Sequence, residues 1–546
     1  MKIKIIILII IFNLFIIINC ISQTVNWDWA KHAGGGGDDI GYSITTNKNI
    51  NNNVIIVGYY NNTACFDTIL LNSINIYGSA FLTVIDTLGN FKWAKRMVGT
   101  NSSYFHSVAS DILENIYVAG SFAETIYLDS LSYTSNGSAD IVIAKYNSGG
   151  VLQWAKSAGG IGLDAGVSIT CSDSLLFVGG EFRDSVYFDS TLLISKGNSD
   201  IFLACLDFDG NYQWIKSAGG TSYDVPRSIT IDYDTNIILS GIVMNNASFG
   251  ETDTSVISYG SSDAFVAKYD YDGGFHWVKS FGGIDEDRGI SVISDSANNL
   301  FLHGYFYGTA YFDAITLTSI GESDYFISKL SPNGSTIWAK KIGATVYPID
   351  DFWNHTLESD EQGNIYITGW FMDSLVYDSL IVQSNGSYDI FVMKIDNDGN
   401  LIWCLTAGNN HSYGDYSRSI AGNGNGSLYI TGRFYSTLFF DDSEVTSYGS
   451  ADVFIAKISE TPLNVEFVKQ TMKINIFPNP ANNEIQIISD NNAIKEVEII
   501  NIKGECVSKN NQTNLNYIDV SKLTKGVYFV RVIFTNMTFT KKIIII

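Results

Sequence analysis

The sequence has little cysteine, and its cysteines follow no regular spacing. One of the six, Cys20, lies within the first 22 residues, and no two of the others form a CxxC pair. The others are Cys65, Cys171, Cys205, Cys404 and Cys506. An odd, scattered set predicts neither a disulfide framework nor a zinc site. The stability of the fold must therefore come from packing.

The sequence also lacks the usual catalytic motifs. Its six histidines occupy unrelated positions, and HExxH, GxSxG, the P-loop and GxGxxG are all absent. No residue is therefore predicted to be catalytic, and we favour a non-enzymatic protein. An enzyme stays open as the alternative, because glycosidases and lyases need only a pair of carboxylates and the chain is rich in Asp.

Long apolar runs are absent except at the N-terminus. Lys2 and Lys4 precede an apolar run from Ile5 to Ile18, which is short for a membrane span but fits the core of a signal peptide. Cys20-Ile21-Ser22 resembles a cleavage site, so residues 1–22 are predicted to be removed, leaving Gln23 as the new N-terminus. Lipidation at Cys20 is the alternative. No span is expected in the mature chain.

Positive charge is scarce over most of the chain. The net charge is −23, and because residues 1–22 carry +2 and residues 466–546 carry +3, residues 23–465 carry −28. Such a surface disfavours nucleic acid and anionic lipid and favours cations, basic partners or neutral glycans. Solubility alone is an equally good explanation of the acidic charge.

What the sequence does contain is a long repeat. A tryptophan followed by small or basic residues and glycine recurs at intervals of 60 to 65 residues. These tryptophans are Trp29, Trp93, Trp154, Trp214, Trp277, Trp338 and Trp403. Between them lie a Ser-Ile strand, an aromatic and β-branched strand, an aromatic-Asp element and a strand of the GSADIVIAK type. Period-2 alternation and glycine-bearing turns such as Asp207–Asn211 identify these segments as strands.

Each unit is a small antiparallel sheet that cannot bury both of its faces alone. Units of this length that stack radially form propeller blades. The last GSADIVIAK-type strand, 452–457, has no tryptophan strand after it, and the first tryptophan strand, 25–33, has no such strand before it. The sequence therefore predicts an all-β fold, a seven-bladed β-propeller over residues 23–460, closed by the N-terminal strand.

The repeated pattern resembles the seven-bladed β-propeller (SBBP) repeats of exported bacterial proteins. The resemblance covers about 435 residues and rests on the in-phase copies of the tryptophan, Ser-Ile and GSADIVIAK-type segments. It implies the architecture only, since such repeats are not tied to one activity.

A different composition follows a linker over residues 461–471. Alternating strands carry Pro478-Asn479-Pro480, then Gly504, then Gly526 and Tyr528, and indicate a small β-sandwich over residues 472–546. These motifs resemble the type A sorting domain of type IX secretion. The resemblance implies the type IX machinery as a partner and a secreted or outer cell-surface location, commonly with later removal of the domain.

One aspartate position recurs four residues before the Ser-Ile strand, with Ser103 in its place in one unit. Its members are Asp39, Asp164, Asp224, Asp287, Asp351 and Asp415. If the first strand lines a central channel, these carboxylates form a ring that would hold a cation such as Ca²⁺ or a basic group. The alternative, which we favour, is that each Asp caps its own loop by accepting backbone hydrogen bonds.

Two further series have structural interpretations. The second aspartate series follows an aromatic pair and is interpreted as turn chemistry at strand ends. It comprises Asp67, Asp129, Asp189, Asp313, Asp378 and Asp441, and Gly250 interrupts it. The repeated tryptophans are predicted to anchor neighbouring blades. The leading functional hypothesis is a surface module that binds glycan or protein, and the alternative is a carbohydrate-active enzyme on the same scaffold.

Overall fold

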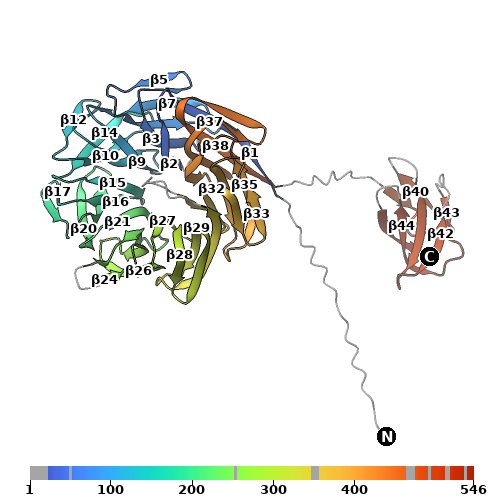
Figure 1. The fold of residues 1–546 in the computed structure, drawn as a ribbon. Helices are drawn as coiled ribbons and strands as arrows, with labels where there is room; N and C mark the ends of the chain where they lie inside the picture. Colours follow the sequence, from blue (N-terminus) through green and yellow to red (C-terminus); the bar gives the residue numbers. More distant parts are fainter. Residues whose placement is uncertain are drawn as a thin grey trace, which may run out of the picture. The chain divides into compact units, whose positions relative to one another are not determined.

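The computed structural model describes most of the chain, and every element in the described residues is a β-strand. The described residues are 23–47, 52–250, 255–345, 356–424, 426–462, 474–489, 494–510, 517–533 and 538–546. Residues 23–461 form one compact unit and the chain from residue 462 onward contributes to another (Figure 1). The prediction of an all-β protein is confirmed. The predicted signal peptide and most of the predicted linker lie outside the described residues.

The first unit repeats one antiparallel order of four strands seven times. The orders are β2-β3-β6-β7, β9-β10-β13-β14, β15-β16-β19-β20, β21-β22-β25-β26, β27-β28-β29-β30, β31-β32-β34-β35 and β36-β37-β38-β1. Figure 1 shows these groups arranged around a common centre. In each group the Ser-Ile strand comes first, the aromatic and β-branched strand second, the GSADIVIAK-type strand third and the tryptophan strand fourth.

The innermost strand of each group begins near the recurrent aspartate. These strands are β2 (Ile40–Thr46), β9 (Ser103–Ser110), β15 (Ala165–Cys171), β21 (Val225–Ile231), β27 (Asp287–Ser294), β31 (Leu357–Ser359) and β36 (Tyr416–Gly422). Each contacts the innermost strand of the next group, and β36 contacts β2 in turn.

The two middle strands of each group are buried. The second strands are β3 (Val54–Tyr60), β10 (Ile116–Phe122), β16 (Leu175–Phe182), β22 (Ile237–Val243), β28 (Leu300–Phe312), β32 (Ile365–Tyr377) and β37 (Ser427–Phe440). The third strands are β6 (Ser79–Ile85), β13 (Asp140–Tyr146), β19 (Asp200–Asp207), β25 (Asp263–Tyr269), β29 (Ile315–Leu330), β34 (Asp389–Ile395) and β38 (Ser443–Pro462). They are apolar on both faces because a neighbouring sheet covers each face. Ile55 and Leu82 of one group share a core with Val118 and Val142 of the next.

The fourth strand of each group carries the recurrent tryptophan. These strands are β7 (Phe91–Arg96), β14 (Leu152–Ala158), β20 (Tyr212–Gly220), β26 (Phe275–Gly283), β30 (Thr336–Thr345), β35 (Leu401–Ala407) and, in the last group, β1 (Gln23–Gly35). Because β1 lies next to β38 in the sheet order, the predicted pairing of the N-terminal strand with the last sheet is confirmed.

Short hairpins extend the sheets beyond the tryptophan strands. They include β4 (Thr63–Phe66) with β5 (Ile69–Asn72), β11 (Thr125–Leu128) with β12 (Leu131–Thr134), β17 (Ser185–Phe188) with β18 (Thr191–Ile194), and β23 (Asn246–Ser248) with β24 (Ser255–Ile257). β33 (Leu380–Gln383) pairs with β32, and β8 (Val98–Gly99) pairs with β11. Elsewhere the hairpin is continuous with the long strands β28 and β29 or β37 and β38.

The turns between third and fourth strands are held by their first aspartate. In the turn between β19 and β20, Asp207 Oδ1 accepts hydrogen bonds from the backbone N–H groups of Asp209 and Asn211, at 3.0 and 2.8 Å. Gly210 takes a φ of 85°, which glycine adopts without strain. The predicted hairpin turn at Asp207–Asn211 is confirmed.

The C-terminal unit consists of two sheets on one core. The first contains β39 (Ile474–Phe477), β40 (Glu484–Ser489) and β43 (Tyr517–Asp519), and the second contains β41 (Glu496–Asn501), β42 (Cys506–Asn510), β44 (Gly526–Ile533) and β45 (Thr538–Ile545). Ile485 of the first sheet and Ile499, Val530 and Ile543 of the second are buried in the same cluster. The predicted β-rich character of residues 472–546 agrees with this arrangement.

Candidate functional site

The innermost strands share a β-bulge at one position, and each bulge presents one extra side chain. In β2, for example, the pairing with β3 shifts between Gly41 and Ser43, so Tyr42 is the additional residue of the bulge. Bulges re-aim side chains and are common next to functional sites. The bulged residues of six groups, called the bulge ring below, are Tyr42, His106, Val167, Arg227, Ile290 and Arg418.

Members of the bulge ring from different sheets interact with one another. The Arg418 guanidinium lies over the Tyr42 ring, 5.3 Å from its centroid, and the rings of Tyr42 and His106 lie 5.8 Å apart. Burial, assisted by the charge of Arg227, lowers the pKa of His106 to about 3. The imidazole is therefore neutral at physiological pH, and its Nε2 lies 2.9 Å from the Ser121 hydroxyl.

Arginine is concentrated around the bulge ring. Residues 23–461 contain six arginines, and five of them lie near the start of an innermost strand, directly after a second strand, or, for Arg433, opposite the first residue of β36. These five, called the arginine belt below, are Arg183, Arg227, Arg288, Arg418 and Arg433. Sequence reasoning missed this belt. The scarcity of arginine elsewhere in the repeats was the signal that would have revealed it.

Tyrosine rings support the guanidinium groups of the belt. Arg183 lies 5.7 Å from the ring centroid of Tyr223. Arg288 lies 5.6 Å from that of Tyr305. The closest such contact is between Arg433 and Tyr416, at 4.8 Å. These distances allow cation–π attraction, which holds each guanidinium over a ring.

Two glutamates lie within the belt. Glu181 is buried and accepts a hydrogen bond from the Ser199 hydroxyl at 2.8 Å, and its charge acts on Arg227. Glu286 forms an ion pair with Arg288. Burial lowers the pKa of Arg227, and the charge of Arg288 acts in the same direction. Arg227 and Arg288, from two neighbouring groups of strands, thus lie close to two carboxylates.

The predicted aspartate ring lies at the same strand starts, but its carboxylates are bonded to the backbone. Asp39, Asp164, Asp224 and Asp287 each accept a hydrogen bond from the glycine N–H four residues earlier, at 2.5 to 2.8 Å. Their second oxygens accept an N–H at the end of the second strand of the same group, as Asp39 does from Asn61 at 2.9 Å. This is the geometry expected of loop caps.

Asp415 differs slightly from the other members. Its Oδ1 accepts from the Tyr435 N–H at 3.2 Å and its Oδ2 accepts from the Asn409 side chain at 2.8 Å. Burial raises the pKa of Asp415 to about 8, and it raises that of Asp39 to about 7. Ser103, which replaces the aspartate in one group, accepts from the Ala80 N–H at 3.1 Å.

The place of Asp351 in the ring stays a prediction. β31 pairs with β32 so that Leu357 faces Ile367, which places Thr356, not His355, at the position of the recurrent serine. Asp351 therefore stands five residues before that position. The segment around it has no Ser-Ile pair to fix the alignment, and Asp351 itself lies outside the described residues.

A second buried carboxylate accompanies each ring aspartate. They are Asp140, Asp200, Asp263 and Asp389, which begin third strands, and Asp452, which lies within β38, and their negative charges raise the pKa values of their ring neighbours. Among the described residues, no group of three or more His, Cys, Asp or Glu side chains is placed to hold a metal ion. The cation ring stays a prediction.

The other two predicted series occupy the positions expected for structural roles. The aspartates of the second series all adopt a positive φ, between 49° and 55°, at the turns of the outer hairpins. The tryptophan indoles lie against the next group: Trp154 Nε1 donates to the Phe208 carbonyl at 2.9 Å, and Trp29 Nε1 donates to the Thr87 carbonyl at 3.2 Å. Trp403 instead donates to the Glu460 carboxylate at 2.7 Å.

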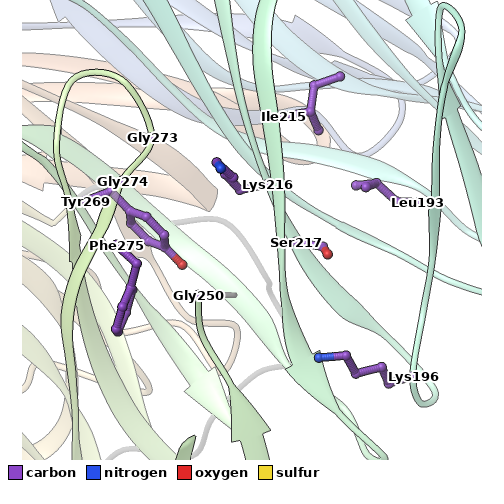
Figure 2. Close-up of a pocket in the computed structure, with 10 residues that line it drawn as sticks. All are labelled: Leu193, Lys196, Ile215, Lys216, Ser217, Gly250, Tyr269, Gly273, Gly274 and Phe275. Carbon is purple, nitrogen blue, oxygen red and sulfur yellow. The ribbon is translucent and has the colours of Figure 1, made fainter. Parts of the chain in front are cut away.

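A cavity of about 550 Å³ lies on the outer side of two neighbouring sheets. Lys196 and Lys216 line it from one sheet and Tyr269 and Phe275 from the next (Figure 2). Gly250, which interrupts the second aspartate series, also lines this cavity. In two other groups the corresponding aspartate pairs with the lysine after the tryptophan, as Lys156 does with Asp189 at 2.8 Å. The cavity coincides with none of the predicted sites.

Comparisons with known proteins give a family for the C-terminal unit. Residues 475–546 match the model described as "Secretion system C-terminal sorting domain". An uncharacterized WD repeat-containing protein of Acanthamoeba polyphaga mimivirus is 23% identical, over 74% of this chain and 36% of its own length. This chain thus spans about a third of that relative.

Solved structures give only distant likenesses. A protein of unknown function from Dyadobacter fermentans is 8% identical with a TM-score of 0.41, over 80% of this chain and 99% of its own. Another, from Bacteroides caccae, is 11% identical with a TM-score of 0.33, over 62% and 94%. Neither likeness bears on the function of this chain.

The sorting domain settles where the protein goes. Within the described residues, no helix has the length and apolar character needed to cross a bilayer. The motifs predicted from the sequence lie inside the matched region, and Asn479 links the first of them to β45: its side chain accepts from the Ile544 N–H at 2.8 Å. Residues 475–546 are a C-terminal sorting domain of the type IX secretion system, and the protein is secreted or held at the cell surface.

Proposed function

We propose that residues 23–461 form a seven-bladed β-propeller that acts as a non-enzymatic glycan-binding module outside the cell. Seven groups of four strands, inner strands that contact one another in succession, and the pairing of β1 with β38 all support a ring of blades. The WD repeat-containing relative supports the same architecture, because WD repeats build propeller blades.

The bulge ring is the observation that carries the binding role. The serine that follows each bulge is the same in all six groups, whereas the bulged residue itself is Tyr, His, Val, Arg, Ile or Arg. A purely structural bulge needs no such variety. All six bulged side chains are buried, so they would act by shaping and supporting the more exposed side chains beside them, such as Tyr104 on His106.

Aromatic side chains next to the bulge ring supply the surface that a sugar ring needs. Tyr104 is half-buried and stacks on Tyr59, with centroids 5.0 Å apart and an interplanar angle of 18°. Tyr104 also stacks on His106 at 5.7 Å. Flat aromatic faces pack against the apolar faces of sugars, and the polar groups around them fix orientation.

A glycan array with the purified chain tests this proposal. We expect binding to a limited set of glycans, lost in Tyr104→Ala and kept in Tyr187→Ala, which removes an exposed tyrosine from an outer hairpin. Absence of binding to every glycan, or equal loss in both variants, would contradict the proposal. If the chain shortens the oligosaccharides it binds, the carbohydrate-active enzyme replaces the binding module.

A further inference from the structure

We infer that Lys329 and Asn397 form a covalent amide bond between their side chains, with Asp295 as the residue that moves the protons. The three side chains come from two neighbouring groups of strands. Asp295 lies in the turn between β27 and β28, Lys329 in β29, and Asn397 in the turn between β34 and β35. The inference is independent of the proposed glycan binding, and it concerns residues to which the sequence motifs assign no role.

The first argument is the contact between the nucleophile and its target. The Lys329 Nζ donates a hydrogen bond to the Asn397 Oδ1, so the nitrogen touches the carbonyl group that it would attack. Groups held within about 3.5 Å in a fixed geometry react far faster than the same groups free in solution. Both residues are held in place. Lys329 is buried with its Nζ 5.2 Å from the centroid of the Phe301 ring, and the Trp338 indole donates to the Asn397 backbone carbonyl at 3.3 Å.

The second argument is the position of the Asp295 carboxylate. Its Oδ2 lies 3.5 Å from the Lys329 Nζ and 3.4 Å from the Asn397 Nδ2, so one oxygen reaches both nitrogen atoms between which protons must move. Burial alone would raise the pKa of Asp295, but hydrogen bonds from Asn299 and Asn397 lower it below its ordinary value. The carboxylate is therefore ionised at neutral pH and can act as a general base.

The reaction balances without an oxidant, a reductant or a cofactor. Asp295 takes a proton from the Lys329 ammonium group, and the resulting amine attacks the Asn397 Cγ. A bond forms between Nζ and Cγ, and the bond between Cγ and Nδ2 breaks. Asp295 transfers two protons in succession from Nζ to the departing Nδ2, which leaves as an ammonium ion. The carboxylate ends ionised, as it began, and the lysine side chain loses its charge.

The preceding group of strands contains the same lysine without the same target. Lys268 stands at the place of Lys329 and pairs directly with Asp232 at 2.7 Å. Pro332 occupies the place of Asn397 in the turn between β29 and β30. An ion pair is thus the arrangement of the repeat. At Lys329 the side-chain amide lies against the amine instead, and the carboxylate stands farther away.

A covalent link at this place would serve the purpose of a disulfide. Proteins outside the cell are commonly stabilised by disulfide bonds, yet the described cysteines of residues 23–461 are all free. Lys329 and Asn397 stand 68 positions apart, so a bond between them restricts the unfolded chain as a disulfide does. It would also fasten the group of β27–β30 to the group of β31–β35.

Mass spectrometry of the purified full chain tests the inference. Loss of ammonia should lower the mass by about 17 Da from the value that the sequence gives for the observed N-terminus. Trypsin should release one branched peptide that contains both Lys329 and Asn397, and tandem mass spectrometry should locate the bond. The branched peptide is the deciding observation, because cyclisation of an N-terminal glutamine lowers the mass by the same amount.

Three variants assign the roles, and a fourth is the matched control. Lys329→Met and Asn397→Ala each remove one partner and should abolish the branched peptide. Asp295→Asn keeps both partners, and at most about a tenth of its chains should be linked, because the proton transfer is lost. The control Lys268→Met removes the equivalent lysine of the preceding group and should leave the yield of branched peptide unchanged. Circular dichroism shows that each variant is folded.

The wild-type chain alone can overturn the inference, since absence of the branched peptide from it means that the bond does not form. Loss of the peptide in a folded Lys268→Met variant would likewise contradict a bond made by these three residues alone. A folded Asp295→Asn variant that is linked as completely as the wild-type chain would overturn the role of Asp295. None of these results bears on glycan binding, which the array tests separately.

Discussion

The Ser419 hydroxyl accepts a hydrogen bond from the backbone N–H of Ile44 at 3.1 Å, although the two residues stand 375 positions apart. The same bond joins other neighbouring inner strands: Ser107 accepts from Ile169, and Ser168 accepts from Ile229, each at 3.1 Å. The recurrent serine therefore links one group of strands to the next. Through Ser419 the series extends from the last group to the first.

Removing this hydroxyl should weaken the link between the two ends of the repeat. Ser419 is fully buried, so we expect Ser419→Ala to lower the free energy of unfolding by about 1 kcal/mol, the usual net value of a hydrogen bond. Urea unfolding measures the change, with Ser190→Ala at an exposed turn as the control. Equal midpoints for the two variants would contradict a structural role for the serine series.

Substitution of a turn glycine should cost more stability where a tryptophan packs on the turn. Gly210 has a φ of 85°, and a Cβ there would lie 3.0 Å from the Trp154 ring. Gly424 has a φ of 74° with open space around it. Gly424→Ala should cost about 1 kcal/mol for the backbone alone, and Gly210→Ala should cost at least about 1 kcal/mol more because the ring must move.

Chemical denaturation of both glycine variants provides the comparison. Because the backbone contribution is similar at the two positions, the difference isolates the contact between the indole and the turn. Equal destabilisation would mean that the tryptophans do not anchor neighbouring groups through these turns.

The stability of residues 23–461 should fall as the pH rises from about 6.5 to about 8.5. Burial raises the pKa of Asp39, Asp164 and Asp287 to about 7 and that of Asp415 to about 8, from 3.8. The folded state thus holds these protons more tightly, and the stabilisation is complete below about pH 4 and lost through pH 7 to 8.

Two buried histidines affect the stability at lower pH. His106 and His303, whose pKa values burial lowers to about 3, favour folding above their ordinary pKa of 6.5 and cost stability only as the pH falls below it. Urea midpoints across the window measure the slope, and Asp415→Asn should make it shallower. Stability that rises with pH over this range would contradict the assignment.

Export should depend on the C-terminal unit. Deletion of residues 475–546 removes the sorting domain and should leave the remaining chain inside the cell envelope of the producing bacterium. Asn479→Ala, which removes two hydrogen bonds to β45, should reduce the exported fraction less than the deletion does. Fractionation with detection of the chain tests both, and export of the truncated chain at full level would show that the domain is dispensable.

The sequence predicts the strands and turns well because they depend on local patterns. The tryptophan spacing, the Asp207–Asn211 turn and the positive φ of residues such as Asp189 all follow from side chains within a few residues of one another. The pairing of β1 with β38 was also predictable. The last GSADIVIAK-type strand has no tryptophan strand after it, and the first tryptophan strand has no GSADIVIAK-type strand before it.

The bulge ring and the arginine belt were not predictable from local patterns. The inner strands are buried along most of their length, so no alternation of polar and apolar residues marks Arg227 or Arg418 as the residue displaced from the ladder. The belt also joins side chains about 60 residues apart, as Arg227 and Arg288 are, and only the radial arrangement brings them together.

The central claim is that seven groups of strands form one cooperative ring that β1 closes. Thermal unfolding of the chain with and without residues 23–36, followed by circular dichroism and tryptophan fluorescence, tests it most directly. The account predicts that the deletion lowers the melting temperature of the whole unit, because it exposes the edge of β38 and removes Trp29 from the turn between β6 and β7. An unchanged melting temperature would contradict it.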